Sequence, residues 1–246
     1  TYVHTFHKED APKQAFAGSE EDDRQVVFSG PHFKATFDKQ SGLLVSYRYK
    51  KQEYIHNGQG PRPFFWRAPT DNDYGAKLPV RLKAWKEASY QEPKAESFNV
   101  VRDKDTTAVK VTYRFPQTDA RWDITYKVYG NGVIKVDNHF VAENAQTPMI
   151  PRVGLRMRLP ARITSLTYYG RGPEENYRDR RTSQFIGEYT SGIKDMYEPY
   201  VRPQENNHRT DIYWCTLTDK AQEGLLFVAD RTFEMNVSNY PLESLD

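Results

Sequence analysis

Apolar and polar residues alternate along the middle of the chain. Nearly every second residue is apolar at 109–115, at 122–128, at 134–140 and at 153–159. Successive side chains of a β-strand point to opposite faces, so this period of two predicts strands with one buried and one solvated face. Four such segments close together in sequence predict one antiparallel sheet.

A turn signal separates the second and third of these segments. The residues there are Gly130, Asn131 and Gly132. Asn-Gly between two alternating runs indicates a β-hairpin in which both turn residues adopt positive φ.

Shorter strand-like runs flank this region, at 25–28, 33–37, 43–49, 163–169, 211–217, 224–229 and 233–237. One helix is predicted at 80–90, where Leu82, Trp85 and either Ala88 or Ser89 fall on one face. The pattern therefore predicts an all-β fold, a large antiparallel sandwich with one short helix.

The first 24 residues are polar and end in an acidic cluster at 19–23. We expect them to form a linker or an N-terminal arm. Residues 25–246 are predicted to form one domain.

The amino-acid composition indicates which kinds of partner the chain is not expected to bind. The 246 residues include 35 Lys and Arg against 33 Asp and Glu, a net charge of +2 that gives no electrostatic case for nucleic acid. No apolar run approaches the length of about 20 residues that spans a bilayer, so we expect no membrane partner. The single cysteine, Cys215, lies in a strand-like run and is expected to be a buried thiol.

The first candidate for chemistry is a predicted loop at 67–75 that contains Arg67, Asp71, Asn72 and Asp73. In an extended segment the two carboxylates would lie on one side, about 6–7 Å apart. They could contact a substrate, or bond their own backbone and a nearby arginine. A calcium loop would need a later Glu that is missing here.

The second candidate is the segment 170–181, with Glu175, Asn176 and Arg180. These residues could supply an acid–base pair with an arginine clamp, or an ion-pair network that locks irregular backbone in place. A buried Arg180 in such a network would be costly to remove.

Glu205 and Asn206 stand close to His208. A glutamate beside a histidine invites comparison with aldose epimerases, which use a general acid and a general base. No partner for His208 is evident in the sequence, and the histidines fall into no metal-ligand spacing. The residues alone assemble no complete active site, so no catalytic residue and no metal ligand is predicted.

Three motifs resemble one known family. They are Arg-Ala-Pro-Thr-Asp-Asn-Asp at 67–73, followed by Trp-Lys-Glu-Ala at 85–88; Gly-Arg-Gly-Pro-Glu-Glu-Asn-Tyr-Arg-Asp-Arg at 170–180; and Asp-Met-Tyr-Glu-Pro-Tyr-Val-Arg-Pro-Gln-Glu-Asn at 195–206. In this order they resemble the C-terminal, small-chain domain of large bacterial β-galactosidases of glycoside hydrolase family 2. The resemblance covers nearly the whole chain.

The resemblance implies a super-sandwich related to galactose mutarotase, which helps to shape a sugar pocket beside a catalytic (β/α)8 barrel. In this family the catalytic residues are two glutamates on the barrel. The resemblance also implies that this domain ends in a sugar-stacking Trp beyond a segment rich in His and Gly, which this chain does not reach, so we expect a fragment truncated at its C-terminus.

The leading hypothesis is therefore a non-catalytic domain of an enzyme that hydrolyses terminal β-galactosides, inactive by itself. Its implied partners are the barrel, the other domains of the same polypeptide and the β-galactoside, with a homo-oligomer at full length. No cofactor is expected on this chain; the Mg or Na ions that full-length members use would be bound mainly elsewhere. The alternatives are a stand-alone carbohydrate-binding or aldose-epimerase-like module, and a purely structural interaction domain.

Overall fold

The computed structural model describes residues 18–102, 106–145 and 147–246. The chain folds as two compact units: unit 1 comprises Thr1–Phe65 and Ala84–Arg158, and unit 2 comprises Trp66–Lys83 and Leu159–Asp246. Most of the predicted N-terminal arm lies outside the described residues, and its described end contains a strand, β1. The prediction of a single domain at 25–246 stays a prediction.

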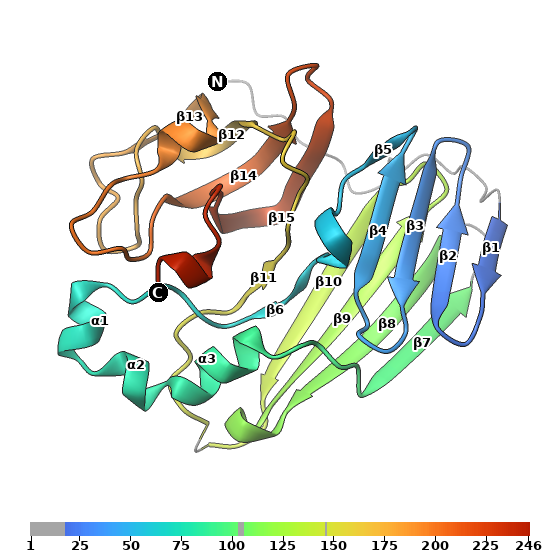
Figure 1. Cartoon of the computed structure of the whole chain (residues 1–246), viewed down its shortest axis with the longest axis horizontal. Coiled ribbons are helices and arrows are strands. Elements are labelled where there is room, and N and C mark those ends of the chain that lie inside the picture. Colours follow the sequence, from blue (N-terminus) through green and yellow to red (C-terminus); the bar gives the residue numbers. More distant parts are fainter. Residues whose placement is uncertain (1–17, 103–105, 146) are drawn as a thin grey trace. The chain divides into compact units, whose positions relative to one another are not determined.

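Unit 1 is a sandwich of two antiparallel sheets (Figure 1). The first has the order β1-β2-β3-β4-β5, with strands Gly18–Glu21, Gln25–Ser29, Phe33–Asp38, Leu44–Tyr49 and Gln52–Glu53. The second has the order β10-β9-β8-β7, with strands Ile134–Ala142, Ala120–Tyr129, Thr106–Phe115 and Ser97–Arg102. A two-stranded ladder joins β6 (Arg62–Phe64) to β11 (Gly154–Arg156).

Aromatic side chains build the core of unit 1. In β9 every second residue is buried, as the alternation predicted. The ring centroid of Phe65 lies 4.8 Å from that of Trp85, 4.9 Å from Phe115 and 5.3 Å from Trp122. Phe37 in β3 lies 5.2 Å from Tyr126 in β9, so the two sheets share one core.

The fourth strand of the second sheet is not the one predicted. That strand is β7, whereas only three residues of the run 153–159 form a strand, β11, in a different sheet. Val153 and Leu155 are exposed. Prolines at 151 and 160 flank this run and lack the N–H that a ladder requires, so its apolar alternation does not extend into a long strand.

The predicted hairpin joins β9 to β10. Its turn differs from expectation in one respect: Gly132 has φ +93°, but Asn131 does not adopt positive φ. Instead the Oδ1 atom of Asn131 accepts a hydrogen bond from the N–H of Val133 at 3.1 Å. The side chain of Asn131 thus closes the turn by itself, and no second residue with positive φ is needed.

Three short α-helices lie within the described residues: α1 (Asp71–Gly75), α2 (Leu78–Arg81) and α3 (Lys83–Tyr90). The helix predicted at 80–90 corresponds to α3 and the end of α2, and its predicted apolar face is buried. Helix α1 lies where a loop was expected. Among the described residues, no helix has the length and apolar character needed to cross a bilayer.

Unit 2 contains a four-stranded antiparallel sheet in the order β13-β12-β14-β15, with strands Phe185–Gly192, Ser165–Gly172, His208–Thr218 and Gly224–Asn236. The two runs predicted at 224–229 and 233–237 belong to one long strand, β15. Cys215 is buried in β14, as expected, and burial raises the pKa of its thiol to about 12. The predicted all-β antiparallel fold is thus confirmed, with two more short α-helices in the described residues than the sequence indicated.

Candidate functional site: a buried polar cluster in unit 2

Helix α1 begins with a capping box. The hydroxyl of Thr70 accepts a hydrogen bond from the N–H of Asp73 at 3.4 Å, and the carboxylate of Asp73 accepts one from the N–H of Thr70 at 3.0 Å. A Thr followed three residues later by an acid is a known signature of a helix start, so the sequence carried this signal. The expectation that Asp71 and Asp73 share one side of an extended segment is therefore wrong.

Arg67 joins two segments that the sequence separates widely. Its guanidinium donates to Asp73 at 2.8 Å and to Glu205 at 3.2 Å. Burial opposes the charge of Arg67, but its bonds with these two carboxylates raise its pKa overall. The N–H of Glu205 also donates to the main-chain oxygen of Ala68 at 3.1 Å. Three of the predicted site residues thus form one paired, mostly buried cluster.

Asn176 is fully buried and its side chain is bonded at both ends. Its Oδ1 atom accepts from the N–H of Thr210 at 3.0 Å and from the hydroxyl of Thr210 at 2.6 Å. Its Nδ2 atom donates to the main-chain oxygens of Arg171 at 3.1 Å and Glu174 at 3.0 Å. The amide therefore fastens the irregular segment after β12 to the start of β14.

Glu175 forms the adjoining part of the cluster. Its carboxylate accepts from Arg180 at 2.6 Å, from the N–H of Asn207 at 2.9 Å and from the hydroxyl of Tyr200. The side chain of Arg180 is 59% exposed, so the expectation of a buried arginine there is wrong. The guanidinium carbon of Arg180 also lies 5.3 Å from the ring centroid of Tyr177, which adds a favourable contact for its charge.

Asn206 and His208 complete the cluster. The side chain of Asn206 donates to the main-chain oxygen of Glu198 and accepts from its N–H. His208 is 6% exposed. Its ring nitrogens lie 2.9 Å from the Oδ1 atom of Asn236 and 3.2 Å from the carboxylate of Glu234.

The partners of His208 come from β15 and were missed in the sequence. The register of β14 with β15 sets His208 opposite Asn236. The two residues are 28 positions apart, and no local sequence pattern indicates their contact. Burial opposes ionisation of Glu234, but its bond with Arg178 and the nearby His208 lower its pKa overall. The ring of Tyr177 stacks on His208 at 5.0 Å and buries the imidazole further.

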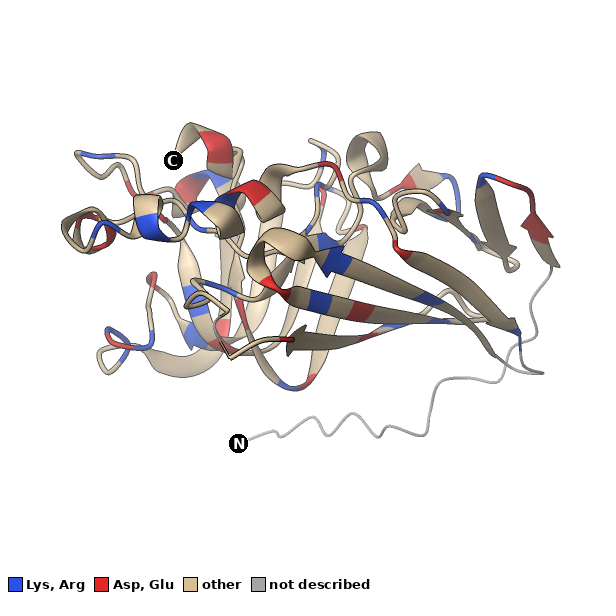
Figure 2. Ribbon diagram, turned by 90° about the horizontal axis from the view of Figure 1, so that it is seen from below, with Lys and Arg blue, Asp and Glu red and all other residues tan. Residues whose placement is uncertain are grey.

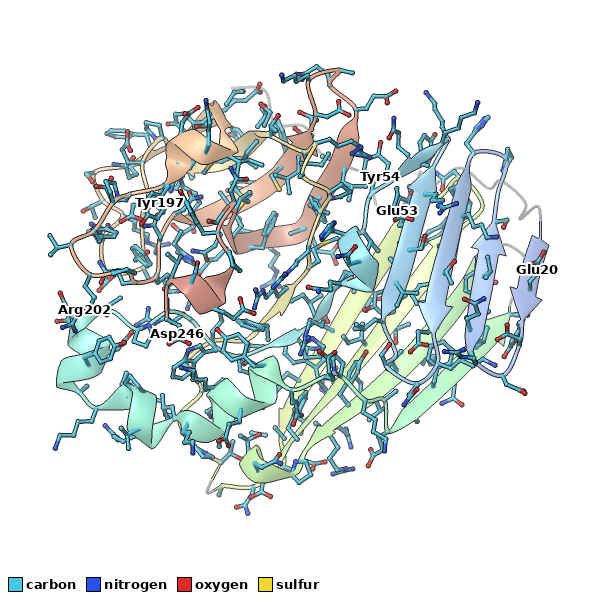
Figure 3. The ribbon with its side chains drawn as sticks, in the orientation of Figure 1. Glu20, Glu53, Tyr54, Tyr197, Arg202 and Asp246 are labelled. Atoms are coloured by element: carbon cyan, nitrogen blue, oxygen red, sulfur yellow. The ribbon has the colours of Figure 1, made fainter. Side chains whose placement is uncertain are left out.

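Two predicted residues lie apart from this cluster. The side chain of Asp71 is 77% exposed and pairs with Arg202 at 3.2 Å, while Asn72 is also exposed. Arg202, labelled in Figure 3, lies 4.9 Å from the ring centroid of Tyr74. The motif 67–73 therefore divides into buried bracing residues and an exposed polar surface on α1.

The carboxylates and the imidazole of the cluster are bonded to neighbouring groups and largely shielded from solvent. A general acid or base, in contrast, must reach the proton that it transfers. Across the described residues, no group of three or more His, Cys, Asp or Glu side chains could hold a metal ion. Basic and acidic residues are interspersed along the same elements (Figure 2).

Comparison with known proteins agrees with the motif pattern. Residues 29–246 match the model of the family described as beta galactosidase small chain. The chain is 34% identical over 230 residues to a beta-galactosidase of Priestia megaterium, covering 92% of this chain and 22% of that protein. It is 34% identical over 221 residues to a beta-galactosidase of Lactobacillus delbrueckii subsp. bulgaricus, covering 89% and 21% respectively. The chain thus spans about a fifth of the length of these relatives.

Substitution of the two arginines of the cluster should lower the free energy of unfolding by different amounts. Arg67→Met leaves the buried carboxylates of Asp73 and Glu205 without their cation, so we expect a loss of about 3–5 kcal/mol in the free energy of unfolding. Arg180→Met removes an exposed cation, and its partner Glu175 keeps its bonds with Tyr200 and the N–H of Asn207, so the loss should be about 1 kcal/mol or less. Urea denaturation of both variants checks this. Equal losses would contradict the assignment of Arg67 as the buried bridge.

Proposed function

The chain belongs to the beta galactosidase small chain family, and we propose that it forms the non-catalytic C-terminal domain of a β-galactosidase. In this proposal the domain lies beside a separate catalytic barrel of the same polypeptide and shapes one side of its sugar pocket. The parent enzyme hydrolyses terminal β-galactosides and assembles as a homo-oligomer.

The burial of the acid–base groups is the observation that carries this proposal. Glu205 is 2% exposed and His208 is 6% exposed, and both are engaged within the cluster. Groups held in this way support the backbone of a site better than they transfer protons. Asp71 and Asn72 on α1 are among the exposed motif residues, and so are available to a sugar or to a neighbouring domain.

Finer points rest on the motif resemblance. The order of the motifs at 67–73, 170–180 and 195–206 supports assignment of the parent to glycoside hydrolase family 2, with two catalytic glutamates on the barrel. It also supports a relation of the sandwich to galactose mutarotase. Any Mg or Na ion of the parent would be bound mainly by its other domains.

A second candidate is an aldose-epimerase-like or carbohydrate-binding module. The arrangement of His208 beside Glu234 and near Glu205, 3.9 Å from the ring, favours it, because epimerases pair an acid with a base. The stacked ring of Tyr177 and the low exposure of His208 argue against access of a sugar to the imidazole.

One prediction separates these two candidates. The isolated chain should neither hydrolyse a chromogenic β-galactoside nor accelerate the mutarotation of α-galactose followed by polarimetry. Hydrolysis by this chain alone would contradict the non-catalytic assignment. Faster mutarotation that is lost in His208→Gln would instead establish the epimerase-like function.

A second prediction concerns the exposed surface of α1 in the full-length parent. Asp71→Ala should lower kcat/KM by about fivefold, the effect of losing about 1 kcal/mol of hydrogen bonding to substrate or to a pocket loop. The thermal midpoint should stay nearly constant, because the pair with Arg202 is exposed.

Glu92→Ala is the matched control, since Glu92 is also an exposed acid but lies outside the three motifs. It should leave kcat/KM unchanged. Equal kcat/KM in the Asp71→Ala variant and the wild type would refute a role of this surface in the sugar pocket.

A further inference from the structure

We propose that the outer face of the sheet in unit 2 binds a flat, neutral oligosaccharide. The sheet consists of β13, β12, β14 and β15, all of which belong to unit 2 (Figure 1). Its inner face is buried and carries, among others, Tyr168 and Cys215. The opposite, outer face includes no residue of α1. The proposed site is therefore separate from the surface assigned to the sugar pocket and does not rest on that assignment.

Two rows of side chains cross the outer face. Residues that stand opposite one another in an antiparallel sheet point to the same side. The register of the four strands therefore sets two rows on this face: Glu188, Tyr169, Trp214 and Val228; and Thr190, Thr167, Thr216 and Leu226. Neighbouring strands lie about 4.8 Å apart, so each row extends over about 14 Å. A row of this length can contact more than one sugar ring.

Apolar and aromatic side chains gather on the outer face. The ring centroid of Tyr169 lies 5.3 Å from that of Tyr213, which is exposed and extends the aromatic surface. Val228 and Leu226 are exposed beside it. Contiguous exposed apolar side chains mark binding surfaces. The C–H groups on the face of a sugar ring pack on aromatic rings, while the polar tips of Tyr and Trp contact its hydroxyl groups.

The indole N–H of Trp214 differs from those of the other tryptophans. The chain contains four tryptophans. The indole N–H groups of Trp66, Trp85 and Trp122 donate to protein oxygens at 3.0, 3.3 and 3.1 Å. That of Trp214 has no hydrogen-bond partner among the described residues. It is therefore available to donate to a ligand on the outer face.

The polar residues of the two rows favour a neutral ligand with hydroxyl groups. Glu188 is exposed and forms no hydrogen bond or ion pair with the described residues, so its carboxylate can accept from sugar hydroxyls and repels an anion. Arg171 lies on the same face but is already paired with Asp211 at 2.7 Å. The hydroxyl oxygens of Thr167 and Thr190 lie 2.9 Å apart. Only one of their two hydrogens can lie between these oxygens, so the other can donate to a ligand.

A protein partner fits this face less well than a saccharide. The cores of protein interfaces are depleted in charged residues, and Thr is rare among the residues that dominate binding. A covering protein would bury the carboxylate of Glu188, which is costly unless the partner supplies a donor. A saccharide carries hydroxyl donors along its whole length. A β-1,4-linked chain of glucose is also flat and presents C–H groups on both faces, which suits an open sheet.

Cellotetraose, a neutral β-1,4-linked tetrasaccharide of glucose, is the probe for this site. In a proton–nitrogen NMR spectrum of the 246-residue chain, it should shift the indole N–H signal of Trp214 in a saturable manner. The indole signals of Trp66, Trp85 and Trp122 should stay in place, because these side chains are buried. Sorbitol offers hydroxyl groups but no ring face, so it should cause no saturable shift.

Variants separate the aromatic contact from the charge. Trp214→Ala should weaken the calorimetric binding of cellotetraose by about tenfold, as expected for a lost aromatic contact. Glu188→Gln should weaken it a few-fold, because hydrogen bonds to a charged acceptor are the stronger ones. The matched control is Glu92→Gln, since Glu92 is an exposed acid outside the outer face, and it should bind like the wild type. Asp71→Ala should also bind like the wild type, so failure of this proposal is distinguishable from failure of the proposed function.

Several results would overturn the proposal. They are the absence of a saturable shift at Trp214, an equal shift with sorbitol, and unchanged affinity in the Trp214→Ala variant. Weaker binding in Asp71→Ala would place the sugar at α1 instead. A signal of Trp214 that moves with protein concentration, together with a dimer in analytical ultracentrifugation, would assign the outer face to a second copy of the chain. If Trp214→Ala fails to fold, Tyr213→Ala replaces it, and wild-type affinity in that variant would contradict the proposal.

Discussion

Unit 2 depends on the need to satisfy buried polar groups of irregular backbone. The segments between its strands carry main-chain N–H and C=O groups that no β-ladder can pair, and each is costly if left unbonded away from water. The side chain of Asn176 meets this need directly, because it bonds main-chain atoms of Arg171 and Glu174, which precede it, and of Thr210 in β14. Glu175 does the same for the N–H of Asn207.

This constraint also accounts for how the charged side chains of the motifs are paired. Arg67, Asp73 and Glu205 are mutually paired, and His208 is held by partners from β15. Once these groups have bonded one another and the backbone, the polar residues left at the surface include those on α1. This division between bracing and exposed residues supports the proposed role beside a catalytic domain.

Much of the architecture could be predicted from the sequence because the relevant signals are local. The alternation at 122–128 and the glycine at position 132 depend on neighbours within a few residues, and both are found as expected. The prediction of a long strand at 153–159 was wrong because periodicity alone does not distinguish a long strand from a short one flanked by prolines.

The site was less predictable because it depends on contacts distant in sequence. The candidate residues near 67, 175 and 205 were recognised, but only the fold shows that Arg67 reaches Glu205 and that Arg180 stays exposed. Glu234 and Asn236 carried no local signal at all, since their role follows from the register of β14 with β15. The capping box at Thr70 is a local sequence signal, and it marks the start of α1 where a loop was expected.

Amide hydrogen exchange at Thr210 tests most directly whether Asn176 holds this part of unit 2 together. The N–H of Thr210 is bonded to the Oδ1 atom of Asn176 at 3.0 Å and is buried. If the account is correct, this amide exchanges only through global unfolding, as slowly as amides in the middle of β14. Exchange as fast as that of the exposed Val201 would contradict it.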